Sequence, residues 1–179
     1  MRSSSIAAIF VASAILAAGA VGHASVFGRQ SPARSSSAGN ADLNSIKTTY
    51  QDRSYGFLTR SGGQFYHGAA PDFLLSDRGG AKFSRAASIQ HANAAMSALS
   101  GAIGSASDPQ ALTYTFDILS AAFSGGQAIV IVSGQVRALS VSDASASTYA
   151  SAAAVFNGVY RDVWVRTPQG WLQKSSHKL

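Results

Sequence analysis

A strict alternation of apolar and polar residues in the stretch LTYTFDI, residues 112–118, constrains the fold of this chain more than any other feature. Apolar side chains occupy every second position there, with Thr113, Thr115 and Asp117 between them. Side chains of a β-strand point alternately to its two faces, so a period of two residues predicts a strand with one buried face. The rest of the chain must supply the core that covers this face.

The sequence after this stretch predicts more strands joined by turns. Gly125-Gly126 suits a tight hairpin turn, and the continuously apolar residues 128–132 predict a strand covered on both faces. A Ser- and Ala-rich loop is expected over 140–147, followed by one long strand over 148–166. The stretch TPQG, residues 167–170, has proline and glycine where a β-turn prefers them, and a last strand follows at 171–178.

The residues before the alternating stretch favour helices. Apolar residues near helical spacing predict a first helix that begins at Asn40 or Asp42 and ends at Ser61-Gly62-Gly63. A short helical segment is expected over 64–70 and a third helix over 84–100, with two short strands between them at 72–76 and 81–85. Helices followed by consecutive strands predict the α+β class. We expect three N-terminal helices packed in a strongly curved antiparallel sheet, a cone-shaped α+β barrel.

Residues 1–24 have the layout of a secretory signal peptide. Arg2 precedes an apolar run from Ile6 to Ala18, and Gly22-His23-Ala24 fits a small-x-small cleavage site. The alternative is an uncleaved anchor, because the next four residues extend the run toward the roughly 20 residues of a membrane span. Residues 25–41 are rich in Ser, Ala and Arg and predict a flexible leader. We therefore expect an exported protein, periplasmic or extracellular, with one folded domain over 42–179 and no membrane partner after cleavage.

Composition argues against several kinds of partner. The chain has no Cys, which excludes disulfides and thiolate metal sites. Its formal net charge is +6, but Lys and Arg are scattered and form no stripe with aromatic residues, so no nucleic-acid partner is expected. His67, His91 and His177 have no metal-ligand spacing, and no phosphate-binding glycine loop is present. We expect neither a metal nor a cofactor.

Two stretches, APDFLLSDRGG at 70–80 and YRDVWVRTPQGWLQKSSH at 160–177, carry a resemblance to a known family. With the element order, they resemble the nuclear transport factor 2-like superfamily, and within it the polyketide-cyclase-like (SnoaL-like) and ketosteroid-isomerase-like domains. The resemblance covers residues 42–179, although Gly63-Gln64 stands where the family usually has Gly-Asp. It implies an apolar pocket between helices and sheet. Members include isomerases, cyclases, dehydratases, transport adaptors and proteins with no known reaction, so the fold alone gives no function.

Three residues match the ketosteroid-isomerase pattern. By that resemblance Asp77 corresponds to the general base, Asp162 to the protonated acid that binds a developing enolate, and Tyr50 to the second donor. Each residue also has a structural interpretation. Asp77 precedes a glycine turn that an aspartate commonly stabilises, Asp162 can pair with an arginine, and Tyr50 falls on the apolar stripe of the first helix. These structural roles are favoured over a joint catalytic role.

The sequence therefore predicts an exported domain that binds a small hydrophobic molecule or acts as a scaffold. The predicted pocket residues are aromatic: Phe65, Tyr66, Phe116, Tyr160 and Trp164. The alternative is a cofactor-independent isomerase, cyclase or dehydratase on a carbonyl-containing substrate, with Asp77 as base and Asp162 and Tyr50 as oxyanion donors. A homodimer through the sheet is compatible with both functions.

Overall fold

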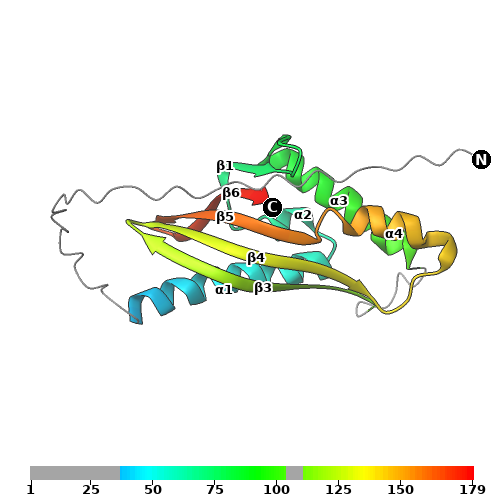
Figure 1. The fold of residues 1–179 in the computed structure, drawn as a ribbon, viewed down its shortest axis with the longest axis horizontal. Coiled ribbons are helices and arrows are strands. Elements are labelled where there is room, and N and C mark those ends of the chain that lie inside the picture. The colour runs from blue at the N-terminus through cyan, green and yellow to red at the C-terminus, as the bar shows by residue number, and fades with distance from the viewer. Residues whose placement is uncertain (1–36, 104–110) are drawn as a thin grey trace, which may run out of the picture. The chain divides into compact units, whose positions relative to one another are not determined.

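The computed structural model of the protein describes residues 37–103 and 111–179 (Figure 1). The predicted signal peptide, residues 1–24, and most of the predicted leader lie outside the described residues. The elements in chain order are α1 (Ser37–Leu58), α2 (Gly62–Phe65), β1 (Ala69–Ser76), β2 (Lys82–Ser84), α3 (Arg85–Ala102), β3 (Leu112–Ser124), β4 (Gln127–Ala138), the 3-10 turn η1 (Asp143–Ser145), α4 (Ala146–Ala153), β5 (Gly158–Thr167) and β6 (Gly170–Lys178).

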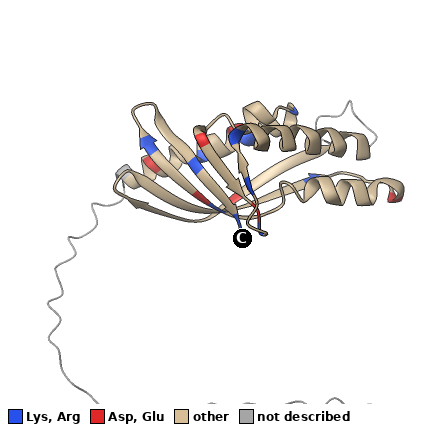
Figure 2. Cartoon of the chain, turned by 90° about the horizontal axis from the view of Figure 1, so that it is seen from above, with Lys and Arg blue, Asp and Glu red and all other residues tan. Residues whose placement is uncertain are grey.

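Six strands form one sheet in the order β2-β1-β6-β5-β4-β3. The sheet is curled and does not close, because β2 and β3 are its two edges (Figures 1 and 2). The predicted α+β class, with three N-terminal helices and a strongly curved sheet, is confirmed. One pair differs from the expected antiparallel arrangement: β1 runs parallel to β6, while all other neighbours are antiparallel. Local sequence patterns predict strands but not which distant strand becomes a neighbour, so this pair was not foreseen.

Helix capping and turn residues explain where most elements begin and end. Ser84 accepts a hydrogen bond from the Ala87 amide at 3.3 Å and starts α3, and Ser61 accepts one from the Gln64 amide at 3.2 Å and starts α2. The expected hairpin turn joins β3 to β4 with both glycines at positive φ, 55° at Gly125 and 81° at Gly126.

The first helix begins earlier than its predicted cap at Asn40 or Asp42. It starts at Ser37, so the end of the predicted leader, 25–41, is helical. Asp42 does not cap the helix; its Oδ1 accepts a hydrogen bond from Trp171 Nε1 at 3.1 Å and lies 3.3 Å from Arg166 Nη2. These contacts with β5 and β6 hold the first turns of α1 in place, which the local sequence could not indicate.

The segment between β4 and β5 is the clearest correction to the predicted elements. The loop expected over 140–147 and the long strand expected over 148–166 are replaced by η1, α4 and the shorter strand β5, which begins at Gly158. Alanine is the best helix former and the residues of α4 lack a two-residue apolar period. Ala152 and Ala153 are buried in the core cluster that also contains residues of α3. Packing against α3 therefore stabilises a helix there.

Buried side chains form two hydrophobic clusters that support the site described below. One joins the C-terminal end of α1, α2, α3 and α4 to residues of β1, β3 and β4, and contains the T-shaped pair Phe57–Phe156 with ring centroids 5.1 Å apart. The other lies where α1 crosses the concave face of the sheet and contains Ile46, Tyr50 and Trp164. Lys and Arg positions are spread over strands and helices rather than gathered in one stripe (Figure 2). Among the described residues, no helix is long and apolar enough to cross a membrane. The predicted homodimer through the sheet stays a prediction.

Candidate functional site

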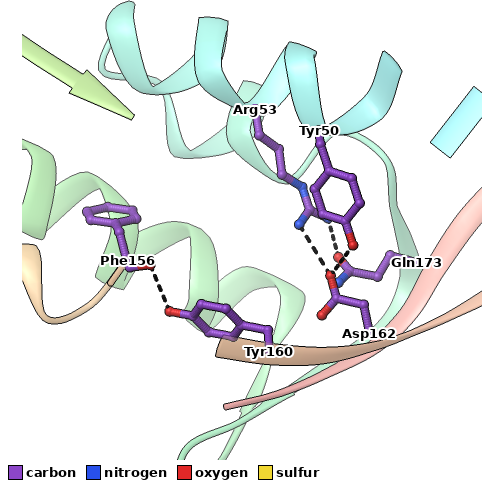
Figure 3. A network of polar contacts seen from close by, with 6 residues as sticks. All are labelled: Tyr50, Arg53, Phe156, Tyr160, Asp162 and Gln173. Atoms are coloured by element: carbon purple, nitrogen blue, oxygen red, sulfur yellow. Dashed lines mark hydrogen bonds and ion pairs between the residues drawn. The ribbon is translucent and has the colours of Figure 1, made fainter. Parts of the chain in front are cut away.

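A buried polar cluster connects α1 with the centre of the sheet (Figure 3). Tyr50 Oη donates a hydrogen bond to Asp162 Oδ2 over 2.6 Å, and Arg53 Nη1 lies 3.8 Å from the same oxygen. Arg53 Nη2 donates to Gln173 Oε1. Tyr50 and Arg53 are three residues apart on α1 and so share one helix face, while Asp162 comes from β5 and Gln173 from β6. Four polar side chains from three elements thus form one network.

The alternation of β5 explains why a strand rich in aromatic and branched residues carries an acid at this place. Asp162 and Trp164 occupy inward positions and are 1% and 0% exposed. Aromatic rings enclose the network: Tyr50 has the rings of Phe116 and Trp164 at centroid distances of 5.1 and 5.4 Å. The Arg53 guanidinium lies 5.0 Å from the Tyr50 ring centroid and 5.7 Å from that of Trp164. The cation therefore has both a carboxyl group and aromatic faces as partners.

Burial dominates the electrostatics of this network. It raises the pKa of Asp162 above its usual value, against the opposing effects of Arg53 and of hydrogen bonding from Ser176, Tyr50 and Gln173. Burial and the neighbouring Asp162 also raise the pKa of Tyr50 well above its usual value, so the phenol keeps its proton and acts as the donor. Asp162 Oδ1 has no donor at standard hydrogen-bond distance and angle. A small void of about 30 Å³ adjoins the cluster, which is room for about one water molecule.

A larger cavity of about 780 Å³ lies outside this cluster, bounded by α3, α4, β1 and β5. Its walls are mainly apolar, with small alanine side chains from the two helices and larger groups from the strands: Ala94, Ala95, Ala98, Ala152, Leu75 and Tyr160. The polar residues on its wall include Asp77, Ser88, His91 and Lys178. We call this space the outer cavity and the small void the inner void.

Tyr160 lies between the two spaces. It lines both of them, as do Tyr66, Leu75 and Val155. Its hydroxyl donates to the main-chain oxygens of Phe156 at 3.0 Å and Val155 at 3.1 Å, just after α4 (Figure 3). In this conformation Tyr160 is a wall between the apolar outer cavity and the polar cluster around Asp162.

Solved structures share this architecture at low sequence identity. An NTF2-like protein with a cystatin-like fold from Novosphingobium aromaticivorans superposes with a TM-score of 0.57 at 15% identity, over 78% of this chain and 82% of that one. A hexachlorocyclohexane dehydrochlorinase, LinA type 2, gives 0.54 at 13% identity, over 78% and 85%. A domain of unknown function with a cystatin-like fold from Nostoc punctiforme gives 0.55 at 11% identity, over 76% and 75%.

The chain has the nuclear transport factor 2-like fold. No protein-family model matches the sequence. The comparison with curated proteins also finds no match. At such identities the likeness establishes the fold and not the reaction, because this fold is shared by proteins of unknown function and by the dehydrochlorinase.

Within this nuclear transport factor 2-like fold, the three predicted catalytic residues do not share one cavity. Tyr50 and Asp162 meet at the inner void, whereas Asp77 lines the outer cavity. Asp77 lies in the turn between β1 and β2, where its Oδ1 accepts a hydrogen bond from the Ala81 amide at 2.8 Å. That is the turn-stabilising role that an aspartate before Arg-Gly-Gly favours. The geometry therefore brings together the two predicted donors without the predicted base.

The five predicted pocket residues divide in a similar way. Tyr66 and Tyr160 line both spaces, and Phe65 lines the inner void. Phe116 and Trp164 line neither of the two; they pack against Tyr50 in the core instead. Their strand positions do face inward, but α1 covers that part of the concave face, so no space remains beside them.

Several residues of the site were not singled out from the sequence. Arg53 could have been found, because it lies three residues after Tyr50 on the predicted helix and therefore on the same face. Gln173, Ser88 and Lys178 gave no local signal, since a polar residue in a strand or helix is ordinarily solvated. No cluster of three or more His, Cys, Asp or Glu side chains suited to a metal occurs in residues 37–103 and 111–179.

Proposed function

We propose that this protein is an exported domain that binds a small, largely apolar molecule in the outer cavity. The observation that carries the proposal is the size and lining of that space. Its volume of about 780 Å³ falls within the roughly 300–1,000 Å³ typical of small-molecule pockets, and its walls are apolar with a few polar groups. Export rests on the signal-peptide pattern of residues 1–24.

The packing around the outer cavity supports a binding role. Alanines of α3 and α4 face this space, where larger side chains would fill it. Val155 is 42% exposed beside it, so apolar surface that could be buried is left open. A ligand that covered this surface would gain roughly 25 cal/mol for each Å² of apolar area removed from water.

Thermal unfolding with a ligand panel tests the proposal. We expect at least one compound among steroids, aromatic compounds and fatty acids to raise the melting temperature of the protein, because a ligand that binds only the folded state stabilises it. Ala94→Phe, on the cavity wall, should abolish that rise. Ser97→Phe is the matched control, since Ser97 is also exposed on α3 but does not line the cavity. The absence of any shift across the panel would overturn the proposal.

A second candidate function is a cofactor-independent reaction on a carbonyl-containing substrate. The raised pKa of Asp162 favours it, because a carboxyl that keeps its proton can donate a hydrogen bond to an oxyanion. Two observations place it second. The Tyr50 hydroxyl already donates to Asp162, and Asp77 lines the other cavity. Enolisation of a cyclic ketone, followed by deuterium exchange, tests this function; Asp162→Asn should abolish any exchange that the protein catalyses.

A further inference from the structure

Lys178, at the end of β6, is the one Lys or Arg among the described residues that line the outer cavity. Lys178 Nζ donates to the main-chain oxygen of Ala154 at 2.5 Å, at the C-terminal end of α4, and lies 5.7 Å from the Tyr160 ring centroid. Gly158 leaves the path for this side chain open, since a Cβ at that position would be 2.7 Å from Lys178 Cε. The lysine is thereby held at the cavity wall, where it is half-buried.

The charge of Lys178 has no partner of opposite sign in the described part of the chain. The ion pairs there involve other basic residues, and no carboxylate lies within 4.0 Å of its ammonium group. Burial and the nearby cation Arg78 lower the pKa of Lys178, as expected for a cation that is partly desolvated and uncompensated. An ammonium group has three N–H donors, and the bond to Ala154 uses one of them.

Ser88 on α3 is a polar group without a hydrogen-bond partner among the described residues. It lines the outer cavity, is 1% exposed, and its Oγ makes no hydrogen bond. Buried polar groups nearly always have a partner, so this hydroxyl has a hydrogen-bonding capacity that no described residue uses. The wall of the outer cavity thus carries a cation without an opposite charge, Lys178, and a hydroxyl without a hydrogen-bond partner, Ser88.

The other charged or titratable groups of the cavity are already engaged. Asp77 follows Ser76, which pairs with His177, so Asp77 and Lys178 lie at the same end of the sheet. Asp77 Oδ1 accepts a hydrogen bond from the Ala81 amide. Asp77 is not among the groups that perturb the pKa of Lys178. His91 makes a T-shaped ring contact with Phe83, with ring centroids 4.8 Å apart.

We infer that the ligand of the outer cavity is an apolar molecule with one carboxylate group, held by Lys178, and that Ser88 gives it a second hydrogen bond. The inference rests on the proposed binding function and adds the chemical class of the ligand. A carboxylate would accept hydrogen bonds from the free N–H groups of Lys178. These hydrogen bonds would be charge-assisted and therefore stronger than neutral ones. The apolar body would cover the alanine-rich walls of α3 and α4.

A head-group series tests the inference. The probes are decanoate, 1-decanol and decylamine, with 1-naphthylacetate, 2-(1-naphthyl)ethanol and 2-(1-naphthyl)ethylamine as a second set on a different apolar body. We expect each carboxylate to bind about tenfold more tightly than its alcohol and the amine to bind most weakly, as calorimetry or competition with a fluorescent apolar dye would show. The preference for the carboxylate should decrease as salt is added.

Two variants and a control assign the preference to residues. Lys178→Met removes the charge and keeps most of the length of the side chain. It should make carboxylate and alcohol bind equally, while the binding of the alcohol shows that the cavity persists. Ser88→Ala should weaken the binding of the carboxylate probes. It should not lower the stability of the free protein, because the Ser88 hydroxyl has no hydrogen-bond partner among the described residues. Lys174→Met is the control: Lys174 is on the same strand but pairs with Asp72 and does not line the cavity.

The outcomes separate the two proposals. Equal binding of carboxylate and alcohol to the unmodified protein, or tighter binding of the amine, would overturn the inference and leave the binding function intact. An undiminished carboxylate preference in Lys178→Met would overturn the role of Lys178. If none of the six probes binds, and the broader panel also produces no thermal shift, the binding function fails as well.

Discussion

The hydroxyl of Tyr50 on α1 and the carboxyl of Asp162 on β5 form a buried 2.6 Å hydrogen bond between residues 112 positions apart in the chain. This bond fixes the first helix to the concave face of the sheet at one point. Arg53 joins the same carboxyl group from one helical turn further along. The network thus couples the position of α1 to the centre of β5, and the first three predictions address it.

Removing the Tyr50 hydroxyl should lower the free energy of unfolding. Tyr50→Phe keeps the ring and its contacts but leaves Asp162 Oδ2 without its closest donor, which we expect to cost about 1.5–3 kcal/mol. Urea denaturation measures the change. Tyr55→Phe is the control, since Tyr55 is on the same helix but is 60% exposed. This variant should lose little of the free energy of unfolding. Equal losses in the two variants would contradict the structural importance of the Tyr50–Asp162 bond.

Removing the charge of Arg53 should be more costly. Arg53→Met fills a similar space but leaves the buried carboxyl without its cation, a change that typically costs about 3–5 kcal/mol. Adding Asp162→Asn to this variant should recover part of the loss, because no buried charge then remains. Denaturation at neutral pH of both single variants and the double variant measures this coupling. Arg137→Met, at an exposed position on β4, should leave stability nearly unchanged. No recovery in the double variant would contradict the prediction.

The raised pKa of Asp162 should give the protein a pH-dependent stability. The folded protein holds this proton more tightly than the unfolded chain, in which the carboxyl has its ordinary pKa near 3.8. The contribution of Asp162 to stability is therefore fully present below pH 3.8 and is lost as the pH rises through the raised pKa. Asp162→Asn does not titrate, so its stability relative to the unmodified protein should increase over that interval. Denaturation across a pH series checks this, and a constant or decreasing difference would show that the pKa is not raised.

Close contact between α1 and α2 should make Gly56 intolerant of a side chain. A Cβ at Gly56 would be 2.5 Å from the Phe65 main-chain nitrogen, and backbone cannot move aside as a flexible side chain can. We expect Gly56→Ala to cost about 1–3 kcal/mol through overpacking. Gly101→Ala on α3 is the matched control; it has no atom within 4 Å and should gain up to about 1 kcal/mol from helix propensity. Thermal unfolding of both variants measures the difference in stability. An unchanged stability of Gly56→Ala would contradict the prediction.

Local signals in the amino-acid sequence were sufficient to predict several elements of the fold. The alternation in 112–118, the glycine pair at 125–126 and the serine that caps α3 at Ser84 depend on neighbouring residues only, and each lies where the structure has the matching element. The order of the elements, helices first and then consecutive strands, predicted the curved sheet over N-terminal helices. The family resemblance singled out Asp162, and the structure places it on the buried face of β5.

The contacts between distant residues depend on the packing of the whole chain and could not be predicted from local patterns. The tertiary structure pairs β1 with β6 in parallel, and it makes α4 a helix through the packing of Ala152 and Ala153 near α3. It places Asp77 at one cavity and Asp162 at another, and it directs Lys178 and Ser88 to the wall of the outer cavity. The physical reason is that side-chain periodicity specifies the buried face of each element, while the partner of that face depends on how the whole chain packs.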